Sequence, residues 1–227
     1  QADFFEKEEK MIFKKNPNLS LASNLDTLVI SANVFENFKI KGNTFINAYS
    51  KVKFINDNLI GKCDSLCYNI SDSIITLYEK PIMWYDQYQV FSDTIIINYF
   101  DKKINNLYLY SKPMMISIHD SLEYNQIKGK KMIGNFINNK LINIRVIGNG
   151  QSIYFLKEKD KTIGMNYLES SNINLVFKNK KINNINYEVI PHSLTTPIED
   201  LKNEDRYLKG FSWRIDEKPL KNEIIHQ

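Results

Sequence analysis

The stretch YFDKKINNLYLY, residues 99–110, decides the fold because the chain repeats its pattern. It predicts a hairpin: an aromatic strand, a polar turn, and a returning strand in which leucine alternates with tyrosine. Similar stretches are FINNKLINIRVI from Phe136 and FKNKKINNINYEV from Phe177, and a looser copy, YNISDSI, starts at Tyr68. The aromatic residues that open these copies, Tyr68, Tyr99, Phe136 and Phe177, are 31, 37 and 41 residues apart. Recurrence at this spacing indicates a repeat architecture.

A second marker follows the returning strands. Gly-Asn or Lys-Pro precedes another apolar run in KGNTFI (41–46), EKPIMW (79–84), SKPMMI (111–116) and IGNGQSIYF (147–155). Glycine and proline punctuate strands, so each unit is predicted to run strand, tight turn, strand, corner, strand. Such a unit is too short to bury its own apolar face, and neighbouring units must therefore stack into an elongated β-solenoid or rolled sheet.

Composition supports an all-β fold. The chain has only four alanines among 227 residues and is rich in Ile, Asn, Lys, Tyr and Phe. These residues favour strands joined by Asn-rich turns over helices.

Charge and cysteine content exclude several classes of function. The 30 basic and 26 acidic residues are interspersed and leave a net charge of +4, so the sequence does not predict a nucleic-acid partner. No apolar run approaches the roughly 18 residues of a membrane helix. The N-terminus QADFFEKEEK has no signal-peptide pattern, which predicts a soluble chain that starts after processing or truncation. Cys63 and Cys67 lie about 13 Å apart if they share one strand, too far for a disulfide.

Period-2 alternation, carried through the repeat, predicts one apolar face. Its members are Leu66, Tyr68, Ile95, Ile97, Tyr99, Leu107, Leu109, Met132, Phe136, Ile144, Val146, Ile173, Leu175, Phe177, Ile185 and Tyr187. The face is either a dry, fully packed core or a greasy wall that stays open to lipid. Alternation alone does not separate these two interpretations.

The sequence changes character in the last part of the chain, after about residue 190. Thr196, Pro197 and Glu199 combine an N-cap, a proline at the first helical position and a capping-box acid, which predicts a short helix near 197–208. Gly210 would end it, and Phe211 and Trp213 would anchor the segment against the last repeat. This segment either caps the terminal strand edges or docks a partner.

No residue pattern indicates catalysis. The three histidines, His119, His192 and His226, have no metal-ligand spacing and no nucleophile beside them. Asp26, Asp64 and Asp93 precede predicted strands, where aspartate usually forms turns. GNGQ at 148–151 lacks the spacing of a phosphate-binding loop. The sequence predicts no catalytic residue, no metal and no cofactor.

Three stretches carry a resemblance to a known family: DSLEYNQIKGKKMIGNFINNKLINIRVIGNGQSIYF from Asp120, IGMNYLESSNINLVFKNKKINNINY from Ile163, and LKGFSWR followed by EKPLKNEII. With these, residues 24–227 resemble the OstA-like proteins of Bacteroidetes, relatives of LptA and of the N-terminal domain of LptD. The resemblance implies a β-jellyroll, or β-taco, in which two facing antiparallel sheets hold lipid A acyl chains in transit. It also implies a periplasmic or outer-membrane-associated location. The implied partners are lipopolysaccharide and other Lpt-type β-jellyroll domains, or a second copy paired edge to edge.

The sequence therefore predicts three segments: an N-terminal segment (1–23) that is a partial repeat or poorly ordered, β-jellyroll repeats (24–190), and a capping tail (191–227). The leading functional hypothesis is a non-enzymatic lipid-binding module of lipopolysaccharide transport, with the sixteen apolar residues above lining its groove. Two alternatives stay open. One is a structural or adhesive β-solenoid with a closed core, and the other is a carbohydrate-active solenoid, which would need converging carboxylates.

Overall fold

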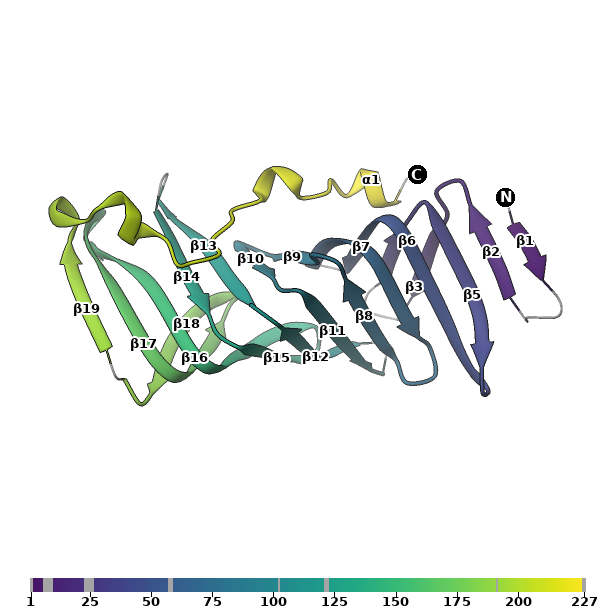
Figure 1. Cartoon of the computed structure of the whole chain (residues 1–227), viewed down its shortest axis with the longest axis horizontal. Helices are drawn as coiled ribbons and strands as arrows, with labels where there is room; N and C mark the ends of the chain where they lie inside the picture. Colours follow the sequence, from purple (N-terminus) through teal and green to yellow (C-terminus); the bar gives the residue numbers. More distant parts are fainter. Residues whose placement is uncertain are drawn as a thin grey trace.

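Strands dominate the described part of the chain, as the composition predicts. The computed structural model describes residues 2–5, 10–22, 27–56, 59–101, 103–120, 123–190 and 192–225, and in these ranges it forms nineteen β-strands. All strand pairs are antiparallel. The strands follow one another along the long axis of an elongated molecule (Figure 1). The all-β prediction is confirmed. Two residues discussed in the search for catalytic groups, Asp26 and His226, lie outside the described residues.

The pairing divides the strands into two layers. Layer A contains β1 (Ala2–Phe5), β2 (Lys10–Lys14), β5 (Val34–Ile40), β8 (Ile74–Tyr78), β11 (Thr94–Phe100), β12 (Lys103–Tyr110), β15 (Lys131–Ile137) and β18 (Lys181–Glu188). Layer B contains β3 (Asn18–Ala22), β4 (Thr27–Ser31), β9 (Ile82–Tyr85), β10 (Tyr88–Phe91), β13 (Met114–Asp120), β14 (Glu123–Lys128) and β19 (His192–Pro197). Four long strands, β6 (Asn43–Asn56), β7 (Leu59–Asn69), β16 (Lys140–Glu158) and β17 (Lys161–Lys178), pass from one layer into the other.

The layers meet along a line of corners, which we call the corner line. Pairs of residues with positive φ bend the chain there: Lys15–Asn16, Ser50–Lys51, Glu79–Lys80, Ser111–Lys112 and Gly148–Asn149. In three of these corners proline follows and fixes φ at the start of the next strand. The register of the long strands shifts at the same line, between Tyr49 and Val52 and between Ile147 and Gly150. The Gly-Asn and Lys-Pro corners predicted at 79–84, 111–116 and 147–155 therefore join the two layers. The remaining one, KGNTFI, forms a hairpin turn within layer A.

Three hairpins of layer A share one geometry. A bulge precedes each aromatic residue, at Asn98/Tyr99, Asn135/Phe136 and Val176/Phe177. The aromatic residue then pairs with the aliphatic residue five positions later, as Tyr99 does with Ile104. The extra residue of a bulge increases the local twist, so the three hairpins bend alike and stack.

Hydrogen-bonded strands continue into both predicted flanks. β1 to β3 lie within residues 1–23, and β19 lies within 191–227. The division of the chain into three segments stays a prediction. Among the described residues, no helix is long and apolar enough to cross a membrane.

After β19 the chain turns back along the outer face of layer B. This segment, which we call the tail, comprises residues 198–225 and runs from the β19 end toward the N-terminal strands (Figure 1). It contains short helices η2 (Ile198–Asp200), η3 (Asn203–Arg206), η4 (Ile215–Glu217) and α1 (Asn222–Ile225). The single helix predicted near 197–208 is wrong, because Thr196 and Pro197 belong to β19, Pro197 takes the N-cap position of η2, and Lys202 is extended between η2 and η3.

Apolar contacts and two buried glutamines hold the tail in place. Leu201 and Leu208 pack into a cluster with outward side chains of layer B, and Ile224 packs at the other end of the tail. Gln126 donates to the Arg206 carbonyl (2.7 Å) and accepts from the Leu208 N–H (2.8 Å). Gln89 pairs in the same way with the Ser212 carbonyl and the Arg214 N–H. Both amides thus replace the backbone partners that an extended segment lacks.

The two aromatic anchors of the tail lie on the outer face of layer B. Phe211 and Trp213 contact the ring of Tyr124 in β14, with centroid distances of 5.2 and 5.3 Å. They pack against the apolar cluster on the outer face of layer B, which includes Ile153 and Phe155 of β16. The tail therefore covers a sheet face rather than a terminal edge.

An ion-pair network near the C-terminal end predicts a pH dependence. Hydrogen bonds from Arg214 and Lys62 lower the pKa of Glu217 to about 2. A carboxylate whose pKa is lower in the folded state stabilises above its unfolded pKa near 4.5, and this contribution is lost as the pH falls toward 2. Because Glu217 is partly exposed, Glu217→Gln should lower the stability at pH 6 by at most about 1 kcal/mol. Thermal unfolding at pH 6 and pH 2 checks this: the difference from wild type should be much smaller at pH 2, where about half of the folded-state carboxylate is protonated, while Asp216→Asn should show no comparable effect at pH 6.

Candidate functional site: the seam between the layers

The sixteen predicted groove residues lie together between the layers. All of them belong to, or pack against, one apolar cluster that runs along the molecule. We call this cluster the seam. Twelve of the sixteen side chains are at most 6% exposed, and Tyr68, Tyr99, Ile185 and Tyr187 are half-buried. Protein side chains therefore fill most of the seam, and the lipid-binding role of these residues stays a prediction.

Sequence reasoning missed the opposite wall of the seam. Layer B contributes its own inward side chains: Leu28, Ile30, Val52, Phe54, Leu59, Cys63, Met83, Tyr85, Tyr88, Val90, Met115 and Ile127. The available signal was the apolar run after each corner, such as IMWY in β9. All four residues of that strand are buried because its outer face is covered as well, so the alternation of a one-sided strand is absent there.

The β9–β10 hairpin spans the seam near the C-terminal repeats. Tyr85 meets Phe136 edge to face at 6.2 Å, and Tyr88 meets Phe177 in the same manner at 5.4 Å. The Tyr88 hydroxyl accepts a hydrogen bond from the Ile182 N–H (3.0 Å) of layer A. Edge-to-face aromatic pairs add about 0.5–1.5 kcal/mol each beyond their burial. This hairpin therefore fastens layer B to layer A at the side opposite the corner line.

A cavity of about 290 Å³ opens between the layers at the N-terminal half of the seam. We call it the mouth cavity. Layer B lines it with Ser20, Leu21, Leu28 and Asn56, and layer A lines it with Tyr68, Ser73 and Tyr99. Two predicted groove residues therefore border open space. The volume lies at the lower limit for ligand pockets, so it would hold part of a lipid chain.

The cysteines are free thiols within this architecture. Cys63 belongs to the seam, and burial together with the charge of Asp64 raises the pKa of its thiol. Cys67 is half-buried, and its pKa is also raised by burial. Both are therefore protonated and unreactive at neutral pH. Within the described ranges, no three His, Cys, Asp or Glu side chains converge on a possible metal site.

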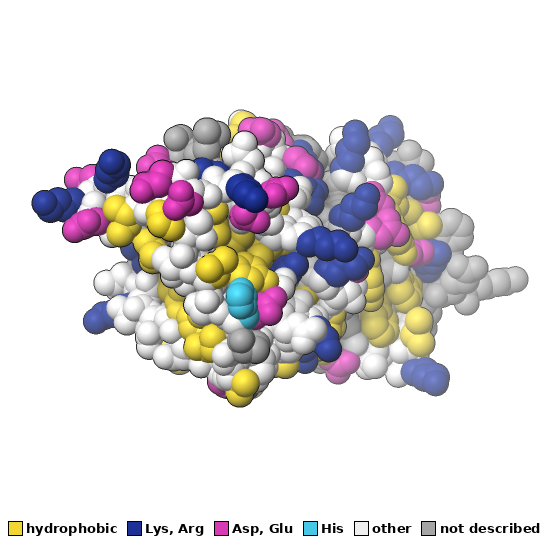
Figure 2. Space-filling model, turned by 60° about the vertical axis from the view of Figure 1, so that its left-hand side comes forward, with side chains coloured by type: hydrophobic (Ala, Val, Ile, Leu, Met, Phe, Trp, Pro, Cys, Tyr) yellow, Lys and Arg dark blue, Asp and Glu magenta, His cyan; other side chains and the backbone are white. Residues whose placement is uncertain are grey.

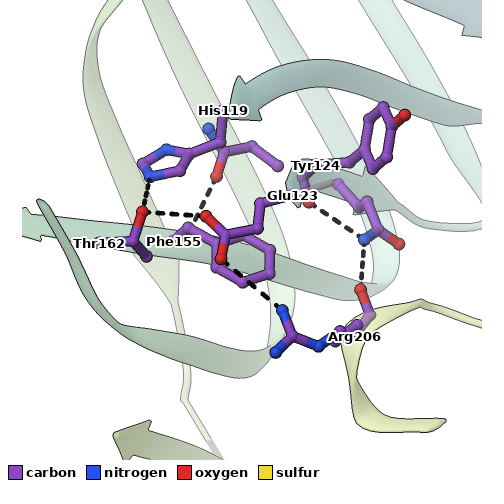
Figure 3. Close-up of polar contacts among 8 residues, drawn as sticks. His119, Glu123, Tyr124, Phe155, Thr162 and Arg206 are labelled. Carbon is purple, nitrogen blue, oxygen red and sulfur yellow. Dashed lines mark hydrogen bonds and ion pairs between the residues drawn. The ribbon is translucent and has the colours of Figure 1, made fainter. Parts of the chain in front are cut away.

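A polar cluster outside the seam joins β13, β14 and β17 to the tail (Figure 3). Thr162 donates to Glu123 (2.9 Å), and His119 Nε2 lies 3.3 Å from the same hydroxyl. Arg206 of the tail lies 3.7 Å from Glu123. Burial and the charge of Lys157 lower the pKa of His119, so its ring is neutral at pH 7. Because the Thr162 proton points to Glu123, His119 does not accept it, and the arrangement fastens the tail rather than activating a nucleophile.

The chain was compared with family models, curated proteins and solved structures. No family model matches the chain. No curated protein matches it. Among solved structures, it is similar to LptH of Pseudomonas aeruginosa, described as the LptA-homologous periplasmic component of the conserved lipopolysaccharide transport device. The sequence identity is 7% and the TM-score is 0.44, over 61% of this chain and 93% of LptH.

Proposed function

We propose that this chain is a non-enzymatic, periplasmic lipid-binding module of lipopolysaccharide transport, with a β-taco fold whose two layers shelter lipid A acyl chains. The observation that carries the proposal is the seam: one apolar cluster runs between two layers that, within the described ranges, share backbone strands only at the corner line. Elsewhere the layers touch through side chains, so they can part without breaking sheet hydrogen bonds. The sequence resemblance to OstA-like proteins supports the same function.

The energetics of acyl-chain burial are adequate for such a role. Each methylene removed from water contributes about 0.8 kcal/mol, so a chain of about a dozen carbons gains roughly 10 kcal/mol gross. The filled seam means that lipid must displace side-chain contacts between the layers. We expect entry at the mouth cavity, where Tyr68 and Tyr99 are already half-buried.

The terminal strands supply the partner surfaces of this proposal. Among the described strands, β18 and β19 each pair on one side only. Figure 2 shows hydrophobic side chains exposed among interspersed charges at this end of the molecule. Leu194 in β19 and the nearby Ile190 are both more than half exposed. An exposed edge with apolar side chains pairs readily with another strand, so a second β-jellyroll domain or a second copy is the proposed partner.

The second candidate function is a structural β-scaffold that binds no lipid. The burial of the twelve seam residues favours it, because a permanently closed core needs no ligand. The two candidates differ in whether the layers part at the mouth cavity.

Tyr99→Asp distinguishes the two candidates. The substitution places a charge at the mouth cavity, and we expect it to weaken binding of a fluorescent lipid A at least tenfold in a detergent-free displacement assay. Phe100→Asp is the matched control, because this neighbouring side chain is 76% exposed and lies outside the cavity. It should change the affinity less than twofold. Absence of binding by the wild-type chain, or equal effects of both substitutions, would leave the scaffold as the function.

A further inference from the structure

A second cavity lies on the outside of the molecule, between the corner line and the tail. Its volume is about 680 Å³, more than twice that of the mouth cavity. One wall consists of corner residues of consecutive strands, from Lys80 and Pro81 to Asn149. The other wall is the tail at Lys209, Gly210 and Arg214. We call this cavity the corner groove, and none of the predicted groove residues lines it.

Positive charge is concentrated in the corner groove. Its basic residues are Lys80, Lys112, Lys128, Lys130, Lys209 and Arg214, and its one acidic residue is Asp93. This lining carries a formal charge of +5, whereas the whole chain carries +4. The rest of the chain is therefore nearly neutral. The folded structure thus gathers the charges that are interspersed in the sequence.

Most of these charges lack a carboxylate partner. Lys112 lies 3.6 Å from Asp93, and Arg214 forms a two-bond pair with Glu217. Lys80, Lys128, Lys130 and Lys209 form no ion pair with any residue in the described part of the chain. Four uncompensated ammonium groups around one cavity favour a bound anion.

The pKa of Lys128 is affected by the neighbouring positive charge in the corner groove. Its ammonium group donates to the carbonyl of Lys209 (3.1 Å) and is half-buried. Burial lowers the pKa of Lys128, and the positive charge of Lys209 lowers it further. An anion in the corner groove would offset both effects, because an opposite charge favours the protonated form.

The apolar part of the lining narrows the class of ligand. Phe91, Met114, Pro81 and Pro113 lie among the basic residues, and Met114 is almost fully buried. A purely ionic ligand would gain nothing from these side chains. An amphiphile would place its charged group against the ammonium groups and its apolar part against Phe91 and Met114.

We propose that the corner groove binds a phosphate-bearing amphiphile, with the phosphate held by Lys128, Lys130 and Lys209 and the apolar part resting on Phe91 and Met114. Phosphate offers several strong acceptor oxygens, which suits three lysines that line one cavity from β14, the residues just after it and the tail. This inference does not rest on lipid binding in the seam. Since the tail forms one wall, bound ligand would also hold the tail against layer B.

Calorimetric titration with dihexanoylphosphatidic acid, a soluble phosphate-bearing amphiphile, tests the proposal. We expect saturable 1:1 binding that weakens as NaCl rises from 50 to 300 mM, because screening reduces the attraction. Lys130→Gln with Lys209→Gln should weaken binding at least tenfold. The same charge change at Lys159→Gln with Lys161→Gln, on the β16–β17 hairpin outside the groove, should change it less than twofold. Thermal unfolding of both variants should match wild type, since all four side chains are exposed.

Three further titrants separate the sources of binding. Inorganic pyrophosphate should bind at least tenfold more weakly than the phosphatidic acid, because it cannot use Phe91 and Met114. Dihexanoylphosphatidylcholine should bind at least tenfold more weakly as well, because its choline opposes the lysines. Equal binding of pyrophosphate, tighter binding of a ten-nucleotide oligothymidylate, or equal loss in both double variants would overturn the proposal. Tyr99→Asp should leave these titrations unchanged, so the test is separate from that of the seam.

Discussion

Leu208→Asp is expected to detach the tail from layer B and to lower the free energy of unfolding by about 3–5 kcal/mol. Leu208 is 5% exposed and packs in the cluster that contains Met114, Ile116 and Phe155. Its N–H also donates to Gln126, which is fully buried. Aspartate at this position would be a buried charge without a basic partner in the cluster. Releasing the tail costs less free energy than keeping this charge buried. The release exposes the outer face of layer B.

Two measurements separate release of the tail from global unfolding. Limited trypsin digestion should cleave the Leu208→Asp variant at the tail lysines much faster than wild type, while the strands stay protected. Binding of a hydrophobic dye should rise because the outer cluster becomes accessible. Leu220→Asp is the control on the same segment, since Leu220 is 62% exposed, and it should shift stability by no more than about 0.5 kcal/mol. A Leu208→Asp variant with wild-type digestion kinetics would contradict the described role of the tail.

Gly61→Ala is expected to destabilise the fold by about 2–3 kcal/mol, through a clash inside the seam. Gly61 pairs with Phe54 across β6 and β7. A methyl group at Gly61 would lie 2.1 Å from the Phe54 ring. Phe54 is 2% exposed and packs in the seam, so its ring must shift against other core side chains to admit the methyl group. Chemical denaturation of the purified variant measures the loss.

A double-mutant cycle tests the cause of this loss. Phe54→Leu alone leaves a cavity and should cost about 1–2 kcal/mol. In the double variant, the methyl group of Gly61→Ala fills part of that cavity. Its loss of unfolding free energy should therefore be smaller than the sum of the two single losses, by at least about 1 kcal/mol. Additive effects would mean that the ring does not lie over Gly61.

The layer A hairpins could be predicted because their information is local. Alternation and a turn of fixed length place Tyr99, Phe136 and Phe177 at equivalent positions. In the structure each has a bulge at the same place and pairs with the aliphatic residue five positions later. The sixteen predicted residues share one cluster for the same reason. The Lys-Pro and Gly-Asn pairs likewise predicted the corners at which the chain passes from layer A into layer B.

The remaining features depend on contacts between distant segments. Strands such as β9 are buried on both faces, which removes the alternation that marks a one-sided strand. The position of the tail depends on Gln89 and Gln126, which are polar residues in strands and carry no sequence signal of burial. The corner groove also depends on the tertiary fold, because its lysines come from separate corners and from the tail. Whether the seam opens is a property of the two layers together, and alternation along one strand does not encode it.

The returning tail also constrains the order of assembly. Glu223 of α1 bonds to Lys53 of β6 (2.6 Å) across 170 positions of the chain. Contacts of such long sequence separation form late, since closing a large loop costs more entropy. During translation, the outer surface of the early strands therefore stays bare until residues 198–225 emerge. A nascent chain of this protein would need shielding from its neighbours during that interval, and slow release from the ribosome would promote aggregation.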